Sequence, residues 1–370
     1  MNFDLTETRQ MLQDGLRRYL SDTVTPEAIA AGTDSPSGLV EGLWEGLTEM
    51  GVPGAMFSEA MGGFGGMGFD IMVVAEELGR AGAPSPLIES AIMAGGVLAE
   101  AGREDLVEEI IGGSILGFAH AEPASRYEMA HVEARAERKG AGWHLVGAKA
   151  VVQHAPAASA FVVSARTEGA ATDDAGLSLF LLPAEAVHLR DYPLNGGGRA
   201  AEMTFDCDLP AEALIGEAGC AFPFIEAAHA RAIAALSAEA LGMMETIKAL
   251  TVDYLRQRRQ FGQPIGKFQA LQHRMADMLV EIEQARSAVI NLCGHLEADR
   301  ATRELHVSAT KNLVGRIARL VVEESIQMHG GIGMTQEYAL GHFAKRLSMV
   351  DHRFGDTDHH LERFIRLAAA

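Results

Sequence analysis

The chain has 370 residues, of which 48% are hydrophobic and 22% are charged, and its formal net charge is −19 at pH 7. This length allows two or three domains with buried cores, and the composition is that of an ordinary globular protein. The negative charge argues against nucleic acid or an anionic membrane surface as a partner. An anionic small ligand remains open, provided that its phosphates meet a local cluster of Arg and Lys.

The sequence gives no indication of a membrane span or of secretion. No apolar run approaches the roughly 20 residues that a membrane helix needs. The first ten residues are acidic and lack an apolar core, so we expect no secretory signal. Cys207, Cys220 and Cys293 show no metal-ligand spacing, which predicts free thiols in a reducing, cytoplasmic compartment.

Residues 1–115 are predicted to be helical. Asp4 followed by Glu7 suits a helix N-terminus. Apolar residues then recur on one helical face, at Leu12, Leu16 and Tyr19. A second helical stretch, Ile71–Gly79, ends at a glycine, the usual C-terminal stop.

Residues 116–212 are predicted to form a β domain, because runs such as AFVVSART and LSLFLLP are bounded by turn residues. From residue 213 to residue 370 the helical period returns. A long amphipathic helix is indicated by Met275, Leu279, Ile282, Val289, Leu292 and Leu296. The order helical, β, helical predicts an α+β fold and does not match the alternation of a doubly wound fold.

The segment Gly63–Gly68 matches G-x-G-x-x-G as a string. A dinucleotide-binding fingerprint also needs a preceding strand and an acidic residue about 20 positions later, within a βαβ unit. The preceding residues, 57–61, do not read as such a strand, and helix follows. We therefore interpret this segment as a flexible glycine loop.

Two later segments suit contact with a ligand. Residues 256–265 carry three arginines beside a phenylalanine and are predicted to turn at Gly262 and Pro264 after a helix. Such a cluster suits an anion held next to a stacked ring, although a solvated helix end is an equal alternative. Residues 327–338 follow another predicted helix and contain three clustered glycines, which allow a backbone to approach a ligand closely.

Together, RQRRQFGQPIGKFQALQHRMADM and QMHGGIGMTQEY resemble the two C-terminal signatures of acyl-CoA dehydrogenases. Weaker matches lie at Leu43–Gly63 and Val73–Gly79, and the order of the three zones matches along the whole chain. The resemblance implies an N-terminal helical domain, a middle β-barrel or sandwich domain and a C-terminal four-helix bundle. It also implies α,β-dehydrogenation of an acyl-CoA thioester, with FAD as cofactor and an electron-transfer protein as acceptor.

In this family the C-terminal motifs clamp an FAD bound mainly by a neighbouring subunit. The resemblance places Arg258 at the pyrophosphate and Phe261 near the adenine end. Arginine suits pyrophosphate because its planar fork donates two parallel hydrogen bonds. The rest of this half of the site falls on Gln269, Gln327, Gly330 and Gly331.

The motifs that form the flavin-ring wall are altered. The family's Thr-Glu-Pro-x-Ala-Gly-Ser-Asp segment aligns with residues 121–128, where Ala121 replaces the threonine and the glycine–serine pair is lost. In the Lys-x-Trp-Ile-Thr/Ser segment, Val151 replaces the tryptophan and Gln153 replaces the hydroxyl residue. Gln153 retains a hydrogen-bond donor, so this wall is weakened rather than abolished.

The family's catalytic glutamate has no counterpart. Its Tyr-Glu-Gly-Thr segment aligns with Arg353–Asp356, which puts Phe354 at the glutamate position, and a second glutamate site used by some members aligns near Ala232. Removal of an α-proton needs a carboxylate within hydrogen-bond reach. Asp356 is the first candidate for a displaced base. Other candidates are Asp351 and Glu239, although such residues are ordinarily structural or solvated.

The histidines near the C-terminus do not predict a metal site. Adjacent histidines on a helix point in different directions, and no second pair stands at ligand spacing. The residues concerned are His352, His359 and His360, with Asp356 and Asp358.

The intact C-terminal motifs, beside an altered ring wall and a missing base, resemble the small subunit of heteromeric acyl-CoA dehydrogenases. These enzymes act on bulky or unusual acyl-CoAs, such as steroid side chains or dicarboxylic acyl chains. The segment Phe354–Leu361 is also similar to theirs. The resemblance implies a non-catalytic subunit that completes a partner's FAD site in a heterotetramer. The alternatives are a self-sufficient homo-oligomer that uses Asp356, a flavin-free scaffold, and an oxidase on the same fold.

Overall fold

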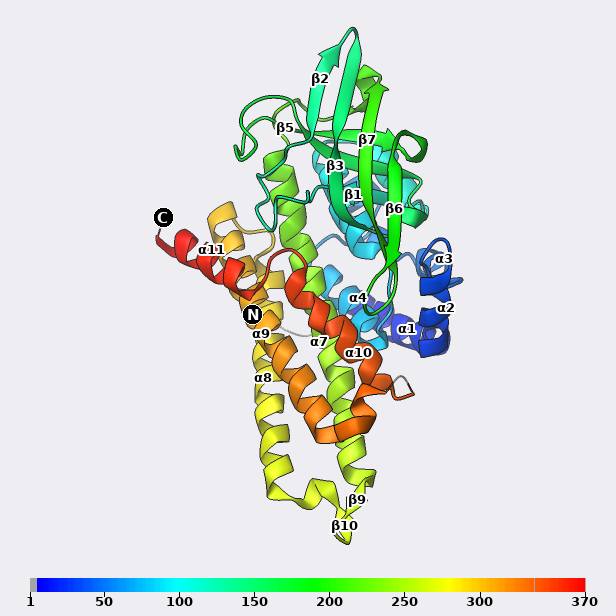
Figure 1. The fold of residues 1–370 in the computed structure, drawn as a ribbon, viewed down its shortest axis with the longest axis vertical. Helices are drawn as coiled ribbons and strands as arrows, with labels where there is room; N and C mark the ends of the chain where they lie inside the picture. The colour runs from blue at the N-terminus through cyan, green and yellow to red at the C-terminus, as the bar shows by residue number, and fades with distance from the viewer. Residues whose placement is uncertain (1–4, 336, 370) are drawn as a thin grey trace. The chain divides into compact units, whose positions relative to one another are not determined.

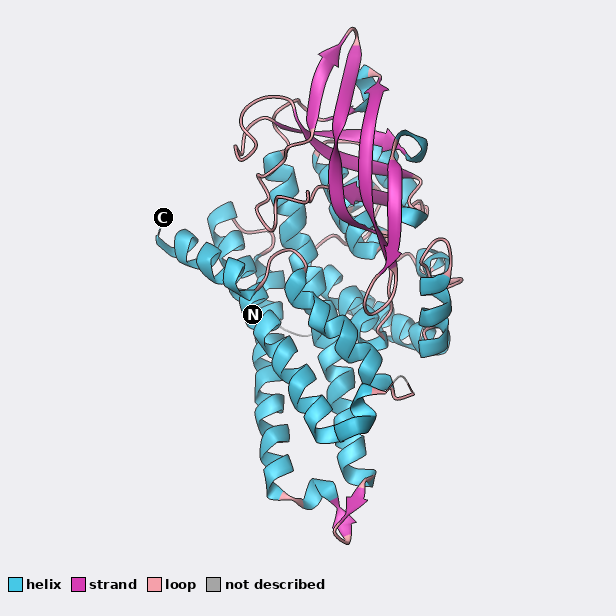
Figure 2. Cartoon of the chain, viewed as in Figure 1, coloured by secondary structure: helices cyan, strands magenta, loops and turns pink. Residues whose placement is uncertain are grey.

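The computed structural model describes residues 5–335 and 337–369. The chain forms two compact units, here called the helical unit and the sheet unit, and its elements are drawn in Figures 1 and 2. The helical unit comprises Met1–Glu27, Gly68–Ala83 and Ile233–Ala370, and the sheet unit comprises Ala28–Met67 and Pro84–Ala232. Each unit draws on more than one zone of the sequence, and the domain boundaries 1–115, 116–212 and 213–370 stay predictions.

Long helices dominate the helical unit. Its elements are α1 (Glu7–Thr23), α4 (Gly68–Ala81), α7 (Phe222–Gln257) from Ile233 onward, β9 (Arg259–Gln260), β10 (Gln263–Pro264), η7 (Ile265–Lys267), α8 (Gln269–His295), α9 (Arg300–His329), η8 (Gly330–Met334), α10 (Ala339–Ser348), η9 (Met349–His352) and α11 (Thr357–Ala369). Helix α9 packs against α8, α10 and α11, and α4 packs against α1 and α8 (Figure 1). The predicted C-terminal helical domain is confirmed.

Capping residues set the start of two of these helices. Thr6 accepts a hydrogen bond from the backbone of Arg9 at the start of α1, and Asp299 accepts one from Thr302 at the start of α9. These side chains satisfy backbone donors that have no partner within the helix. Asp4, which we expected near the first helix start, lies outside the described residues.

Gly79 does not end its helix, as the sequence predicted. Helix α4 continues to Ala81, and a Cβ at Gly79 would lie 1.9 Å from the main-chain oxygen of Glu239 in α7. A Cβ at Gly242 in α7 would likewise lie 2.0 Å from the main-chain oxygen of Glu76. Glycine is required at both positions because any side chain would force the two backbones apart.

The predicted amphipathic helix corresponds to α8, with one correction. Met275, Ile282, Val289 and Leu292 are buried as expected, whereas Leu279 is 38% exposed. Leu279 follows Met275 by four residues and Met278 by one. Met278 is the buried residue at this level of the helix.

Short helices and one sheet make up the sheet unit. Its helical elements are most of α2 (Pro26–Asp34), α3 (Leu43–Glu49), η1 (Gly54–Met56), η2 (Glu59–Met61), η3 (Ile88–Ala94), α5 (Gly95–Glu100), α6 (Glu104–Ile111), η4 (Ala155–Ala157), η5 (Ala184–Ala186), η6 (Ala211–Ala213) and α7 up to Ala232. Its strands are β1 (Leu116–Ala119), β2 (Arg135–Lys139), β3 (Gly142–Gln153), β4 (Ala160–Arg166), β5 (Leu177–Pro183), β6 (His188–Pro193), β7 (Arg199–Leu209) and β8 (Leu214–Ile215).

The strands form one mixed sheet, drawn in magenta in Figure 2. Their order is β6-β7-β3-β2-β4-β5-β8, and β1 pairs in parallel with β4. Strands β2 and β4 share only the residue pair Arg135 and Arg166, so the sheet consists of two antiparallel groups joined at one point. Alternate residues of β7, including Met203 and Phe205, face the core. The α+β fold with a middle sheet domain is confirmed.

The glycine loop at Gly63–Gly68 is closely packed, which our interpretation as a flexible loop did not include. A Cβ at Gly63 would lie 2.3 Å from the main-chain oxygen of Phe57, and a Cβ at Gly66 would lie 2.9 Å from Phe57 carbonyl carbon. The Arg231 side chain donates a hydrogen bond to the Gly66 carbonyl. The segment before the loop is 3₁₀-helical rather than a strand, so the context of a dinucleotide fingerprint is missing.

Two further observations concern the whole of the described chain. Cys207, Cys220 and Cys293 form no disulfide bond within the described part of the chain, as predicted. None of the described helices is both long and apolar enough to cross a membrane.

Candidate cofactor and active site

The first C-terminal motif forms a tight hairpin at the end of α7 (Figure 1). Phe261 and Gly262 connect β9 to β10 with backbone φ angles of 53° and 80°. Two consecutive positive φ angles are the requirement of a type I′ turn. The turn therefore lies at Phe261 and Gly262, whereas Pro264, which we expected in the turn, belongs to β10.

Phe261 combines backbone strain with exposure. The residue is 90% exposed, and its only described ring contact is an edge-on contact with Phe268, at a centroid distance of 6.1 Å. A bulky residue rarely adopts a left-handed conformation, and such strain is retained mainly at functional sites. The chain's own packing does not explain a large apolar ring at this tip.

Arg258 presents its guanidinium to solvent. Its backbone N–H donates to the Tyr254 carbonyl at 2.8 Å, and its carbonyl accepts from Ile265 N–H at 2.8 Å, which closes the base of the hairpin. The Arg258 side chain forms no hydrogen bond or ion pair with any of the described residues. Gln269 is also exposed, at the first position of α8. The motif thus holds an uncommitted cation on a well-fixed backbone.

The second motif begins inside α9 rather than after it, because Gln327 precedes the helix end at His329. Gln327 is exposed, and Gly330 follows with a φ of 67°. A Cβ at Gly331 would meet no atom of the described residues within 4 Å, and the φ of Gly331 is not positive. Neither packing against the described residues nor backbone conformation explains this glycine.

An aromatic cluster brings the two motifs together. The Tyr254 ring, one turn before Arg258, stacks on His329 with centroids 4.5 Å apart and planes inclined by 25°. His329 directly precedes Gly330. Of the six cofactor residues expected from the sequence, Arg258 and Gly330 are therefore linked through neighbouring residues. Gln269 and Gln327 are exposed on α8 and α9, with no described contact that joins them to this cluster.

Several hydrogen bonds hold the segment that the sequence predicted to align with the family's glutamate position. Phe354 has a φ of 56° and Gly355 a φ of 103°. The Lys311 ammonium donates to the Gly355 carbonyl at 2.5 Å and to the Asp351 carbonyl at 3.4 Å, and His360 Nε2 donates to the Phe354 carbonyl at 2.8 Å. Burial lowers the pKa of Lys311 to about 8 and that of His360 to about 3.

The three carboxylates considered as displaced bases all have structural partners. Asp356 Oδ1 accepts the backbone N–H of His359 at 2.8 Å in the first turn of α11. Asp351 Oδ1 accepts from the backbone N–H and the hydroxyl of Thr357, at 3.0 and 2.7 Å. Glu239 forms an ion pair with Arg346. Ala232, which the sequence predicted near the second glutamate site, is fully buried.

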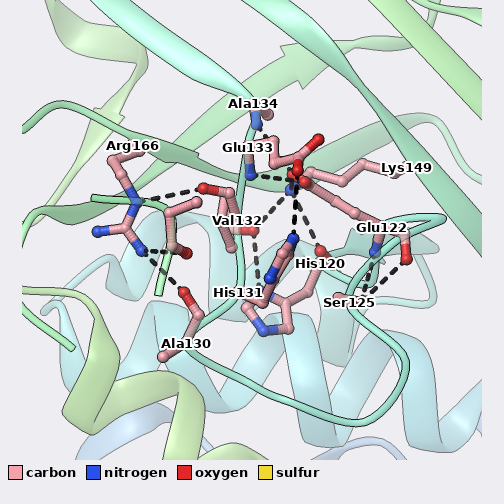
Figure 3. A network of polar contacts seen from close by, with 12 residues as sticks. His120, Glu122, Ser125, Ala130, His131, Val132, Glu133, Ala134, Lys149 and Arg166 are labelled. Carbon is pink, nitrogen blue, oxygen red and sulfur yellow. Dashed lines mark hydrogen bonds and ion pairs between the residues drawn. The ribbon is translucent and has the colours of Figure 1, made fainter. Parts of the chain in front are cut away.

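A buried polar network occupies the sheet unit (Figure 3). The Lys149 ammonium donates to Glu122 Oε1 at 2.7 Å, to Ser164 Oγ at 3.0 Å and to the His120 carbonyl at 3.2 Å. Ser164 Oγ therefore accepts from Lys149, and its hydroxyl donates to His120 Nδ1 at 2.8 Å. Burial lowers the pKa of Lys149 to about 8 and holds the pKa of His120 well below its usual range.

This network fixes the segment that the sequence predicted to align with the flavin-ring wall. Glu122 also accepts the backbone N–H groups of Glu133 and Ala134, at 2.6 and 3.1 Å. The buried Arg166 donates to the carbonyls of Ala130 and Val132, at 2.8 and 3.2 Å (Figure 3). Sequence reasoning missed this network, although a lysine within an apolar strand was a signal for a buried partner.

Backbone strain collects at the motif positions. Among the described residues, the non-glycine residues with positive φ are Arg126, Val151, His154, Phe261 and Phe354. Four of these five positions were singled out by alignment with the family's motifs: the glycine after Thr-Glu-Pro-x-Ala, the tryptophan, the hairpin phenylalanine and the glutamate. Val151, a β-branched residue, lies where the pairing of β3 with β7 shifts register.

Comparison with known proteins assigns the family. Models of the acyl-CoA dehydrogenase N-terminal, middle and C-terminal domains match residues 6–117, 117–206 and 225–366. The acyl-CoA dehydrogenase IpdE2 of Mycobacterium tuberculosis is 31% identical over 342 residues, which cover 92% of this chain and 91% of that protein. The chain belongs to the acyl-CoA dehydrogenase family. Its relatives in this family are oxidoreductases.

A second relative and a solved structure are also similar to this acyl-CoA dehydrogenase family protein. The (2S)-methylsuccinyl-CoA dehydrogenase of Cereibacter sphaeroides is 30% identical over 91% of the chain, which spans 65% of that protein's length. A solved structure of the Tcur3481-Tcur3483 steroid ACAD superposes with a TM-score of 0.87 at 28% identity, covering 98% of each chain. Within the described part of this family member, no group of three or more His, Cys, Asp and Glu is arranged to hold a metal ion.

Proposed function

We propose that the chain acts in FAD-dependent α,β-dehydrogenation of an acyl-CoA thioester as a subunit that completes the FAD site of a partner. The observation that carries this proposal is a contrast between two parts of the helical unit. Arg258 is exposed and the backbone at Gly331 is open toward the described residues, whereas Phe354 is predicted to stand where the family's base would be. The chain therefore offers cofactor contacts without an evident base.

The residues of the clamp fit FAD. Arg258 is an uncommitted guanidinium in a protein of net charge −19, and it would donate paired hydrogen bonds to the pyrophosphate. The backbone at Gly330 and Gly331 has room for close approach of the cofactor, and Phe261 presents an apolar ring. FAD, when bound, supplies the hydride acceptor. Gln269 and Gln327 would complete the polar lining.

The missing base supports a partner subunit as the source of catalysis. Phe354 has no group that accepts a proton, and α-proton removal needs a positioned carboxylate. Asp356, the first candidate for a displaced base, already caps α11, and Asp351 and Glu239 are bound by neighbouring groups. A partner subunit would supply the base, and the pair would form a heterotetramer that passes electrons to an acceptor protein.

The relatives favour a heteromeric enzyme and a bulky acyl chain. The solved steroid ACAD is described by two names together, Tcur3481 and Tcur3483. We extend this to the present chain as part of the proposal: its partner is a second acyl-CoA dehydrogenase subunit, and its substrate is an acyl-CoA.

The experiment compares the purified chain alone with the chain co-expressed with a candidate large subunit. Absorbance at the flavin bands measures bound FAD, and bleaching on addition of acyl-CoA measures reduction. We expect flavin and bleaching only in the co-purified complex. Bleaching by the chain alone would overturn the proposal in favour of a self-sufficient enzyme, in which Asp356→Asn should then abolish bleaching. A complex with the large subunit that contains no flavin would point to a scaffold.

A further inference from the structure

The stacked pair of Tyr254 and His329 is the contact that joins the two clamp segments. Tyr254 belongs to the last turn of α7, and His329 is the last residue of α9. Their rings lie 4.5 Å apart at 25°, which is the offset stacking that aromatic rings prefer. Neither ring belongs to the six residues expected to contact FAD.

Each ring is tied to its own segment by main-chain hydrogen bonds. The Tyr254 carbonyl accepts the N–H of Arg258 at 2.8 Å. The Gly330 N–H donates to the Ile326 carbonyl, and His329 Nδ1 donates to the Ser325 carbonyl at 2.8 Å. The hydrogen bond from His329 Nδ1 to the Ser325 carbonyl fixes the orientation of the imidazole. A shift of either ring would therefore be transmitted to the backbone of Arg258 or of Gly330.

A third ring closes the cluster. Tyr338, which lies beyond η8, has its centroid 5.2 Å from that of His329 and 6.3 Å from that of Tyr254. The short segment Gly330–Met334 is thus bracketed by two rings that contact one another. His329 is buried, and this burial lowers the pKa of its imidazole. The three rings therefore form one contact cluster between the end of α7 and the end of α9.

We propose that Tyr254 and His329 are positioning residues that hold the Arg258 guanidinium and the Gly330–Gly331 backbone at the spacing of a dinucleotide pyrophosphate. This inference rests on the proposed function. The reason is geometric: the two groups come from different helices, and a pyrophosphate is gripped only if both reach it together. Preorganisation of such groups lowers the entropic cost of binding.

The test measures the dissociation constant for FAD of the complex with the large subunit. Tyr254→Leu and His329→Leu remove a ring but keep an apolar side chain, and each should weaken FAD binding by about tenfold. Tyr254→Phe and His329→Phe retain the stack and should weaken binding less than the leucine variants. His329→Asn, whose amide still donates to Ser325, separates loss of the ring from loss of the hydrogen bond.

A double-mutant cycle with Arg258 distinguishes positioning from general stability. If Tyr254 acts through Arg258, Arg258→Ala should cost less FAD affinity in the Tyr254→Leu background than in the wild type. Additive losses, or leucine variants with wild-type affinity, would overturn the inference while the proposed function stands. Failure of the wild-type complex to bind FAD would instead contradict the proposed function. If the leucine variants fail to fold, the same cycle with His329→Asn decides the question.

Discussion

Lys149 Nζ lies 2.7 Å from Glu122 Oε1, and the two side chains are 0% and 4% exposed. A buried ion pair is stable only when its remaining donors and acceptors are also satisfied. Here Ser164, a main-chain carbonyl and two main-chain N–H groups complete the pair. The pair therefore anchors the segment from Glu122 to Ala134, and the charged side chains cannot be removed one at a time without penalty.

We predict that Lys149→Met lowers the free energy of unfolding by about 3–5 kcal/mol, because Glu122 is left buried and charged. Adding Glu122→Gln should recover part of this loss, because it removes the unpaired buried charge. The recovery should be incomplete, since Glu133 N–H and Ala134 N–H donate to different carboxylate oxygens and the amide has only one oxygen acceptor. Urea unfolding of the single and double variants measures both values. A loss below about 1 kcal/mol for Lys149→Met would contradict a buried, mutually dependent pair.

Lys311 predicts a pH dependence of stability. Its pKa is about 8 in the folded chain and 10.5 as an ordinary lysine, because burial disfavours the charged form. Between these pH values the unfolded chain binds more protons than the folded chain, so the free energy of unfolding rises with pH. Below this window both states hold the proton, and the full penalty of burying the charge remains.

The measurement is urea unfolding at intervals across this window for the wild type and for Lys311→Met. The free energy of unfolding of the variant should rise less with pH than that of the wild type. The rise that remains in the variant should come from Lys149, whose pKa is also about 8. Equal slopes in the two proteins would show that Lys311 does not titrate in this range. Methionine is the matched substitution because it keeps the length of the apolar stem.

Phe354 predicts a difference between two truncations. Its φ of 56° costs a residue with a Cβ about 1 kcal/mol, and glycine avoids this cost. Phe354→Gly should therefore be more stable than Phe354→Ala by about 1 kcal/mol, although both lose the same ring contacts. Thermal and urea unfolding compare the two variants. An alanine variant as stable as the glycine variant would mean that the loop relaxes when the ring is absent.

Arg258 predicts a specific loss of cofactor. Arg258→Ala in the complex with the large subunit should weaken FAD binding by about tenfold or more, because charge-assisted hydrogen bonds to the pyrophosphate are lost. Arg256→Ala is the matched control: it removes an exposed arginine from the same helix end. Flavin content after gel filtration reads out both. Equal flavin content in the two variants would contradict the assignment of Arg258 to the cofactor site.

Motif spacing predicted the family, the order of helical and β zones, and the candidate clamp residues, because these depend on local residue types. Errors arose where a residue's role depends on a distant backbone. Gly79 looked like a helix end but permits close approach of α7, and the start of the second motif lies within α9. Leu279 fitted the helical period but is partly exposed, since burial depends on which face of α8 meets a neighbour.

The sequence by itself determined that this chain resembles the acyl-CoA dehydrogenase family, and it predicted Phe354 at the position of the family's glutamate. Only the tertiary structure placed Tyr254 against His329 and so joined the two clamp motifs, and only it paired Lys149 with Glu122. It also located the strained backbone at Arg126, Val151 and Phe354. The physical reason is that residue types and the spacing of apolar residues can be read directly from the sequence. Stacking, ion pairing and left-handed backbone are instead imposed by contacts between segments far apart in sequence.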